Sequence, residues 1–234
     1  MFTTDLMPFS SVYLALEPIR AMSDYVAGQT ASLTSLPQGD GHPVIVFPGL
    51  GMSGAQTADM RGRLQQLGYV VYDWTQGVNN WPDTDFDEWL SPLGQHLEEV
   101  SADHGCTVSI VGWSLGGIYA RELAKRHPAL VRQVITLGTP RLEKSNSAEA
   151  EWAFSWLGTV TSSIDDTLLD SLSTDPAVPS TSIYSQTDGV VAWQSCMRPE
   201  SSLHRNIKVN GVGHMGLVHH PEVLRVVAGL LAQP

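Results

Sequence analysis

The stretch SIVGWSLGGIYARELA, residues 109–124, decides the fold of this chain of 234 residues. It begins with apolar and β-branched residues typical of a strand buried on both faces, and it continues from Leu115 with residues typical of a helix. Ser114 stands at the junction, between Gly112 and Gly116, in a G-x-S-x-G pattern. This pattern predicts a turn so sharp that the serine backbone is strained and only small residues fit beside it. Ser114 is therefore our candidate nucleophile.

Short apolar runs alternate with helix-like segments along the rest of the chain. The alternation predicts about six mostly parallel strands flanked by helices. The expected strands are residues 43–47, 69–74, 107–113, 131–137, 182–185 and 206–209. The expected helices are residues 53–67, with Ser53 as the N-cap, 85–103, 115–127 and 221–232.

Two segments are additional to this alternation of strands and helices. Residues 9–35 predict an N-terminal helix that runs over the core, and residues 141–180 form an insertion too long for an ordinary connection between strands. Within the insertion, Trp152, Trp156 and Val160 fall on one face of an expected helix. Two interpretations stay open for it: packing against the core, or a helical cap over an active site.

A serine becomes a strong nucleophile when a histidine takes its proton and an acid orients that histidine. His214, in NGVGHMG, follows the last expected strand at the edge where Ser114 must stand. Asp188, in SIYSQTDGVV, follows the strand before it, and the order Ser, Asp, His is the order expected for an α/β-hydrolase. The remaining histidines, expected at the surface or in loops, are His42, His96, His104, His127, His204, His219 and His220.

An attacked carbonyl also needs two N–H donors for its developing negative charge. The backbone N–H of Leu115, next to the nucleophile, can supply one. The second is expected from Leu50, because Gly49 and Gly51 permit a tight bend after the first strand. The loop PGLGMSG could instead cradle a phosphate, but it matches neither the P-loop nor the dinucleotide-binding spacing.

Composition limits the other classes of function. The net charge of −11 argues against nucleic-acid binding and adhesion to anionic membranes, and no apolar run is long enough to span a bilayer. Residues 1–18 lack the basic start of a signal peptide, so we expect a cytoplasmic protein. Cys106 and Cys196 match no metal or redox spacing; we prefer two buried thiols and leave a single disulfide open. We expect no metal or organic cofactor.

Five segments together amount to a resemblance: PVIVFPGLG, GWSLGG, VITLGTP, TSIYSQTDGVV and RNIKVNGVGHMGLV. They resemble the small Bacillus-type bacterial lipases, which are compact α/β-hydrolases, over most of residues 43–234. The resemblance implies a single α/β-hydrolase domain over residues 1–234. It also implies that Ser114, Asp188 and His214 are the catalytic triad and that the N–H groups of Leu50 and Leu115 form the oxyanion hole.

The chain departs from that family in several ways. Pro48 stands where the small lipases usually have His, and Trp113 replaces the more common His beside the nucleophile. Those lipases also lack the N-terminal helix and the insertion, and they are exported. GWSLGG resembles some intracellular carboxylesterases that act on acyl-carrier esters.

These observations predict a carboxylic ester hydrolase that works through an acyl-serine intermediate on a small-molecule or lipid ester. An acyltransferase or thioesterase with the same triad is the alternative, and a non-catalytic binding protein on this scaffold is less favoured because all three triad members are present. Candidates for the substrate pocket are Trp113, Met52, Trp74, Trp81, Trp193 and Met215. Residues 74–81 could form one wall of an acyl pocket, or their aromatic side chains could pack against the N-terminal helix. Met52, Trp193 and Met215 could equally belong to the core.

Overall fold

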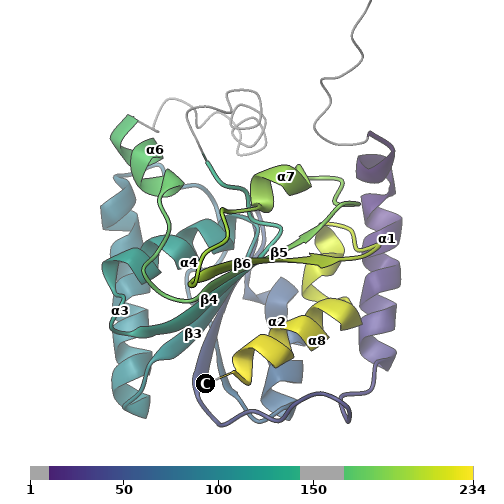
Figure 1. Cartoon of the computed structure of the whole chain (residues 1–234), viewed down its shortest axis with the longest axis horizontal. Coiled ribbons are helices and arrows are strands. Elements are labelled where there is room, and N and C mark those ends of the chain that lie inside the picture. Colours follow the sequence, from purple (N-terminus) through teal and green to yellow (C-terminus); the bar gives the residue numbers. More distant parts are fainter. Residues whose placement is uncertain (1–10, 143–165, 234) are drawn as a thin grey trace, which may run out of the picture.

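The structure is a computed structural model, and it describes residues 11–142 and 166–233. These residues form a six-stranded sheet in the order β2-β1-β3-β4-β5-β6, with helices on both faces (Figure 1). All paired strands are parallel, which confirms the expected architecture. The strands are β1 (Pro43–Phe47), β2 (Val70–Asp73), β3 (Val108–Trp113), β4 (Val131–Leu137), β5 (Ser180–Ser185) and β6 (His204–Val209).

Helices cover the sheet in two layers. The helical elements are α1 (Ser11–Thr30), α2 (Gly54–Gln66), α3 (Phe86–His104), α4 (Leu115–Arg126), α6 (Asp166–Ser173), α7 (Trp193–Cys196), the 3-10 helix η2 (Met215–Val218) and α8 (Pro221–Leu231). Helices α3 and α4 pack on one face of the sheet against Ile45 and Phe47. Helices α2 and α8 pack on the other against Val44 and Val46. Because successive side chains of β1 point to opposite faces, its continuous apolar run supplies both cores.

Most element bounds follow from the sequence. Strands β1 and β4 have the expected bounds, whereas β5 and β6 each begin two residues earlier than expected. Ser53 is confirmed as the N-cap of α2, where it forms a capping box with Gln56. The short helices α7 and η2 were not predicted, because four residues carry no helical periodicity.

The turn from β3 into α4 is packed so closely that it requires glycine. A Cβ atom on Gly112 would lie 2.5 Å from the Cα of Gly117, and a Cβ on Gly117 would lie 2.0 Å from Oγ1 of Thr139. Both distances are shorter than any Cβ contact that a folded protein tolerates. Strand, helix and the loop after β4 can therefore meet at Ser114 only because these positions lack side chains.

The insertion between β4 and β5 is described in part. The expectations for Trp152, Trp156 and Val160 lie outside the described residues. Helix α6 follows them, and its C-terminal end is tied to α4, since Ser171 donates from Oγ to Glu122 at 3.1 Å and accepts from Lys125 at its carbonyl. The end of the insertion is thus anchored on the face of the sheet that α4 covers.

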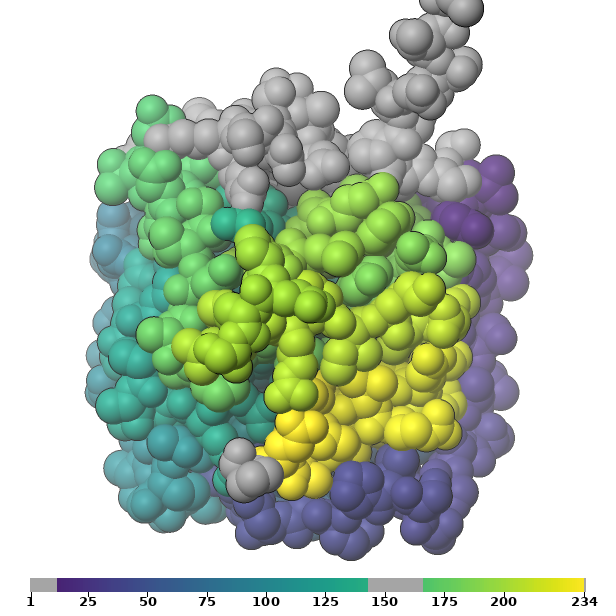
Figure 2. Space-filling model, in the orientation of Figure 1, coloured from purple at the N-terminus to yellow at the C-terminus, as the bar shows by residue number. Residues whose placement is uncertain are grey.

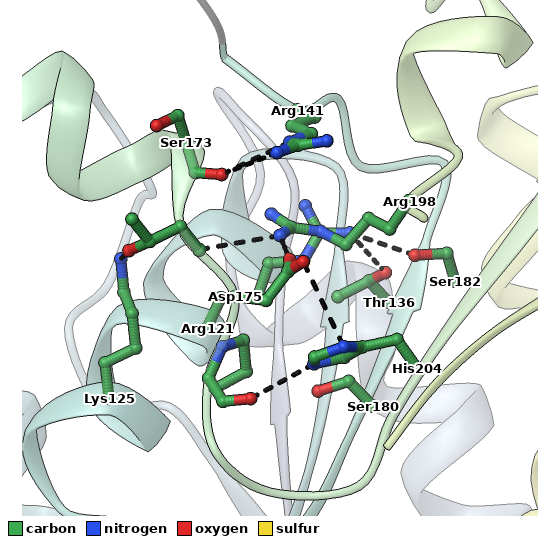
Figure 3. A network of polar contacts seen from close by, with 12 residues as sticks. Arg121, Lys125, Thr136, Arg141, Ser173, Asp175, Ser180, Ser182, Arg198 and His204 are labelled. Atoms are coloured by element: carbon green, nitrogen blue, oxygen red, sulfur yellow. Dashed lines mark hydrogen bonds and ion pairs between the residues drawn. The ribbon is translucent and has the colours of Figure 1, made fainter. Parts of the chain in front are cut away.

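A buried polar network fastens α4 to the sheet (Figure 3). Arg121, 3% exposed, donates hydrogen bonds to Oγ1 of Thr136 in β4 at 2.9 Å and to Oγ of Ser182 in β5 at 3.2 Å. Burial lowers the pKa of Arg121 to about 10, so the guanidinium stays protonated at neutral pH. Arg198 and Asp175 form an ion pair in the same network. These bonds fix the helix that begins at Ser114.

The structure corrects two expectations about single residues. Cys106 is exposed rather than buried, and it forms no disulfide with Cys196. His42 is buried, not a surface residue, and its ring bonds to Oγ of Ser109 at 2.9 Å. No helix within the two described ranges is both long and apolar enough to cross a lipid bilayer.

The close packing at the turn predicts opposite effects for two glycine substitutions. We expect Gly112→Ala to lower the free energy of unfolding by about 1–3 kcal/mol, because the added methyl group overlaps Gly117. Gly62→Ala, within α2, should raise it by roughly 0.5–1 kcal/mol, because nothing lies within 4 Å and alanine favours the helix. Urea unfolding of both variants checks this, and a neutral Gly112→Ala would contradict the packing described.

Candidate active site

The candidate catalytic residues meet at the carboxyl edge of the sheet. Ser114 directly follows β3, Asp188 lies in the turn after β5, and His214 lies in the turn after β6. In a parallel sheet all these turns open on the same edge, so residues far apart in sequence come together there. All three side chains belong to buried residues, with Ser114 8% exposed, Asp188 5% and His214 1%.

Ser114 has a strained backbone. Its φ is 53° and its ψ is −121°, a region that costs a residue with a side chain about 1–3 kcal/mol. Two bonds hold this conformation: the Ser114 N–H donates to the carbonyl of Leu137 at 2.8 Å, and Oγ1 of Thr139 donates to the carbonyl of Ser114 at 2.9 Å. The strain is thus maintained by the last residue of β4 and by Thr139, which follows that strand.

Asp188 and His214 form a hydrogen-bonded pair. Nδ1 of His214 lies 2.7 Å from Oδ2 of Asp188. The other carboxylate oxygen, Oδ1, accepts from the N–H groups of Val190 at 2.8 Å and Val191 at 2.7 Å. Gly138 lies against the pair, since a Cβ there would be 3.1 Å from both facing atoms. The carboxylate is therefore fixed from one side while its second oxygen orients the imidazole.

The environment of His214 makes its imidazole a stronger base than usual. Burial alone lowers the pKa of His214, but the charge of Asp188, their hydrogen bond and the charge of Glu17 outweigh it, so the pKa is raised above its ordinary value. A histidine of this kind takes up a proton readily, and the neighbouring carboxylates stabilise the resulting imidazolium.

The loop after β1 lies directly against Ser114. A Cβ on Gly49 would be 3.3 Å from Cβ of Ser114, and the positive φ of 70° at Gly51 makes the bend tight. Within the described part of the chain, neither the Leu50 N–H nor the Leu115 N–H donates a hydrogen bond. Neither of the two expected oxyanion donors is therefore bound to another group of the described residues.

Asn79 braces this loop, a role that the sequence did not predict. Its side-chain N–H donates to the carbonyl of Pro48 at 2.6 Å. Its backbone accepts from Gly51 and donates to Met52, both at 2.7 Å. We expected the surrounding segment, residues 74–81, to form a pocket wall. An asparagine in a loop has many ordinary explanations, so no signal singled this one out.

Two of the predicted pocket residues line one cavity. Trp113 and Met215, neighbours of Ser114 and His214 in sequence, lie on a cavity of about 300 Å³. Helix α1 closes its other side, and the remaining lining residues are Pro18, Ala21, Met22, Tyr25, Gln56 and His219. The Trp113 indole also donates to the carbonyl of His214 at 3.2 Å, so this side chain helps to fix the histidine.

The other predicted pocket residues lie elsewhere. Trp81 lines a second cavity, of about 320 Å³, near Phe86 and α6. Trp74 is 1% exposed in the core and packs on Phe47 and Trp89, so the alternative of packing on the N-terminal helix was wrong. Met52 packs against the core under α2 and α8, and Trp193 stacks on Tyr184 with ring centroids 5.6 Å apart. Their roles toward a substrate stay predictions.

Comparison with solved structures identifies the fold class: the chain has the α/β-hydrolase fold. It superposes on the mature form of the Bacillus licheniformis lipase BlEst2 with a TM-score of 0.62 and 20% identity, over 84% of this chain and 94% of that one. It also superposes on an Exiguobacterium antarcticum esterase with a TM-score of 0.56 and 15% identity, over 83% of this chain and 93% of that one.

Sequence comparison finds shorter similarities. A pimeloyl-[acyl-carrier protein] methyl ester esterase from Aromatoleum aromaticum is 40% identical over 60 residues, 24% of this chain and 24% of that protein. The biotin biosynthesis bifunctional protein BioHC from Teredinibacter turnerae is 46% identical over 41 residues, 18% of this chain and 7% of that protein. The chain thus matches a quarter or less of the length of these relatives. No protein-family model matches the sequence.

No group of three His, Cys, Asp or Glu side chains is placed to hold a metal ion within residues 11–142 and 166–233.

The contacts of Asn79 predict that its side chain keeps the loop after β1 rigid. Asn79→Ala should lower the free energy of unfolding by about 1–3 kcal/mol, because the buried Pro48 carbonyl loses its donor. Amide hydrogen exchange at residues 49–52 should accelerate as well. Asn80→Ala is the matched control, since Asn80 is exposed and offers Tyr119 only its backbone carbonyl. Equal exchange in the two variants would contradict this role.

Proposed function

We propose that this chain is a carboxylic ester hydrolase in which Ser114 is the nucleophile, His214 the general base and Asp188 the residue that orients the base. The observation that carries the proposal is the 2.7 Å bond between Asp188 and His214, formed at the edge where the strained Ser114 begins α4. The names of similar proteins, two esterases and a lipase, support the same class of reaction.

The reaction proceeds in two halves. His214 takes the proton of Ser114 Oγ as that oxygen adds to the ester carbonyl carbon, and the resulting imidazolium gives this proton to the departing alkoxide. The second half repeats the steps with water as the nucleophile, so the acyl-serine is cleaved to the free acid and Ser114 regains its proton. Asp188 stabilises the imidazolium in both halves.

The negative charge on the attacked oxygen needs donors that are already in place. The N–H groups of Leu50 and Leu115 take this role, each contributing on the order of 3 kcal/mol by analogy with a measured donor deletion. The positive end of the α4 dipole lies at the same position and adds to the effect. Asn79 braces the loop that carries Leu50 through its bond to the carbonyl of Pro48.

A small-molecule or lipid ester is the substrate class that we propose. The cavity beside Trp113 and Met215 is lined largely by apolar side chains, which suits an acyl chain. The net charge of −11 disfavours nucleic-acid substrates. Transfer of the acyl group to another alcohol or to a thiol uses the same residues, and it is an outcome that the first experiment distinguishes.

The first test is hydrolysis of p-nitrophenyl esters from acetyl to palmitoyl. We expect wild type to be active and Ser114→Ala to lose at least about a thousandfold in kcat, because no other group replaces the nucleophile. Fluorophosphonate should label wild type and leave Ser114→Ala unlabelled. Ser101→Ala is the control, because the hydroxyl of this α3 serine donates to the carbonyl of Cys106, which precedes β3, whereas Ser114 follows that strand.

The products decide between the related reactions. A peak at short acyl chains would indicate an esterase with a confined pocket, and a peak at long chains that persists on emulsified triglyceride would indicate a lipase. If a new ester forms preferentially when a competing alcohol is added, the reaction is acyl transfer rather than hydrolysis. Full activity in Ser114→Ala would overturn the mechanism.

The raised pKa of His214 predicts the pH dependence. His214 must be neutral to act as the base, so kcat/KM should rise with pH as the imidazolium loses its proton. Because the charges of Asp188 and Glu17 outweigh burial and raise this pKa, the midpoint should lie above the ordinary value of about 6.5. A pH profile of kcat/KM on a neutral ester checks this, and a midpoint well below 6.5 would contradict the geometry.

A further inference from the structure

Helix α1 has its charged side chains on the inside. Glu17 is 4% exposed and Asp24 is 8% exposed, although a surface helix usually directs such residues to solvent. Its exposed apolar residues are Val12, Leu14, Leu16, Ile19, Met22, Tyr25 and Val26. A buried carboxylate is costly unless it is hydrogen-bonded, so the inner face of α1 requires partners of a specific kind.

The partners of Glu17 belong to the two turns that carry the catalytic pair. Oε1 of Glu17 accepts from the N–H of Gly189 at 2.8 Å and from the N–H of His214 at 2.9 Å. Oε2 accepts from the N–H of Met215 at 3.1 Å. Gly189 directly follows Asp188 in sequence. One carboxylate therefore joins the backbone beside Asp188 to the backbone of His214 itself.

Arg20, one turn later on α1, joins the same two turns a second time. It donates to the carbonyl of Thr187 at 2.5 Å and to its Oγ1 at 2.8 Å, both beside Asp188. It also donates to the carbonyl of Gly211, in the turn that carries His214, at 3.0 Å. The Arg20 guanidinium is 3.9 Å from Glu17, which offsets part of the cost of burying that carboxylate.

The helix approaches these turns more closely than side chains would allow. A Cβ on Gly189 would lie 2.5 Å from the backbone of Tyr13, and a Cβ on Gly213 would lie 2.8 Å from Oε2 of Glu17. Figures 1 and 2 show α1, in purple, along the side of the molecule beside the yellow-green and yellow C-terminal segments. The close contact between α1 and the two turns therefore requires glycine at positions 189 and 213.

We propose that Glu17 is a positioning residue: its carboxylate fixes the turns of Asp188 and His214 relative to each other, so that the two side chains stay aligned for proton transfer. The proposal rests on the proposed function, since it concerns the same catalytic pair. Glu17 acts through backbone N–H groups and does not touch the reacting atoms.

Two properties make a carboxylate suited to this task. Its two oxygens can accept three bonds at once, and bonds to a charged acceptor are about twice as strong as neutral ones. A misplacement of about 1 Å can cost a hundredfold in rate, so a brace between two otherwise independent turns has a direct effect on kcat. Each turn follows a different strand, and the sheet alone does not fix their outer ends.

Glu17 also contributes a negative charge near the imidazole. The charged and titratable groups around the His214 turn are Asp188 after β5, then Glu17, Arg20 and Asp24 on α1, and His219 and His220 after η2. Among them, Asp188 and Glu17 raise the pKa of His214 against the effect of burial. Removal of the Glu17 charge should therefore lower this pKa and shift the acid limb of kcat/KM to lower pH.

The experiment compares Glu17→Ala and Glu17→Gln with wild type. We expect Glu17→Ala to lose about ten- to a hundredfold in kcat with KM changed less than about threefold, because the alignment is lost while the pocket remains. Glu17→Gln keeps an oxygen that can accept from Gly189 and His214, so it should recover most of kcat. The acid limb of kcat/KM for Glu17→Gln should nevertheless lie at lower pH than that of wild type.

Glu122→Gln is the matched control. Glu122 is a buried carboxylate, 1% exposed, but its partners are Lys125, Arg126 and Ser171 on the other face of the sheet. Its replacement should lower the thermal midpoint of unfolding and leave kcat, normalised to fluorophosphonate-reactive protein, and the pH profile unchanged. If the two Glu17 variants behave like Glu122→Gln, the positioning role is overturned.

A spectroscopic measurement separates this proposal from the proposed function. NMR titration of His214 in wild type and Glu17→Gln reports the imidazole pKa whether or not the protein hydrolyses esters, and it also decides the case if Glu17→Ala does not fold. An unchanged pKa together with unchanged kcat would overturn the role of Glu17. Absence of Ser114-dependent activity in wild type, with the pKa shift present, would instead overturn the proposed function.

Discussion

The backbone of Ser114 is the constraint on which the rest of the structure depends. A residue with a side chain adopts its dihedral angles only at a cost of about 1–3 kcal/mol, so neighbours must hold it there. Those neighbours are the carbonyl of Leu137 and the hydroxyl of Thr139, both from the segment at the end of β4. The glycines at 112 and 117 follow from the same requirement, because a side chain at 112 would separate β3 from α4 and one at 117 would separate α4 from Thr139. Strain at one residue thus dictates sequence at several others.

Parallel strands bring the proposed catalytic residues to one edge of the sheet but do not align them. Asp188 and His214 follow different strands, and each turn has freedom at its outer end that the sheet does not remove. The structure limits this freedom with bonds to backbone: Val190 and Val191 fix one oxygen of Asp188, and the indole of Trp113 holds the carbonyl of His214. Helix α1 then joins the two turns to each other. The sheet supplies proximity, and the bonds to backbone supply alignment.

The sequence predicted what depends on periodicity and chain order, and it missed what depends on bonds to backbone. Strand β1 was predicted with its observed bounds because its apolar run is sharply bounded by turn residues. The pairing of Asp188 with His214 followed from their places after successive strands. The sequence did not indicate the roles of Asn79 and Glu17. Both side chains bond to backbone groups, which every residue has, so the residues that they contact show no pattern. The burial of His42 was missed for a related reason, since its contact with one side-chain hydroxyl, that of Ser109, leaves no periodic pattern in the sequence.

Two sets of residues on helix α1 have different contacts, so each set can vary without affecting the other. Its inner residues Glu17 and Arg20 bond to the catalytic turns, whereas Met22 and Tyr25 line the cavity shared with Trp113. A side chain that only lines a cavity contributes to ground-state and transition-state binding alike, and so acts on KM. In the role that we propose, Glu17 acts on kcat, because the alignment of a base matters most when the proton moves. Since these residues occupy different faces of the same helix, pocket shape can change while the register of the two turns is preserved.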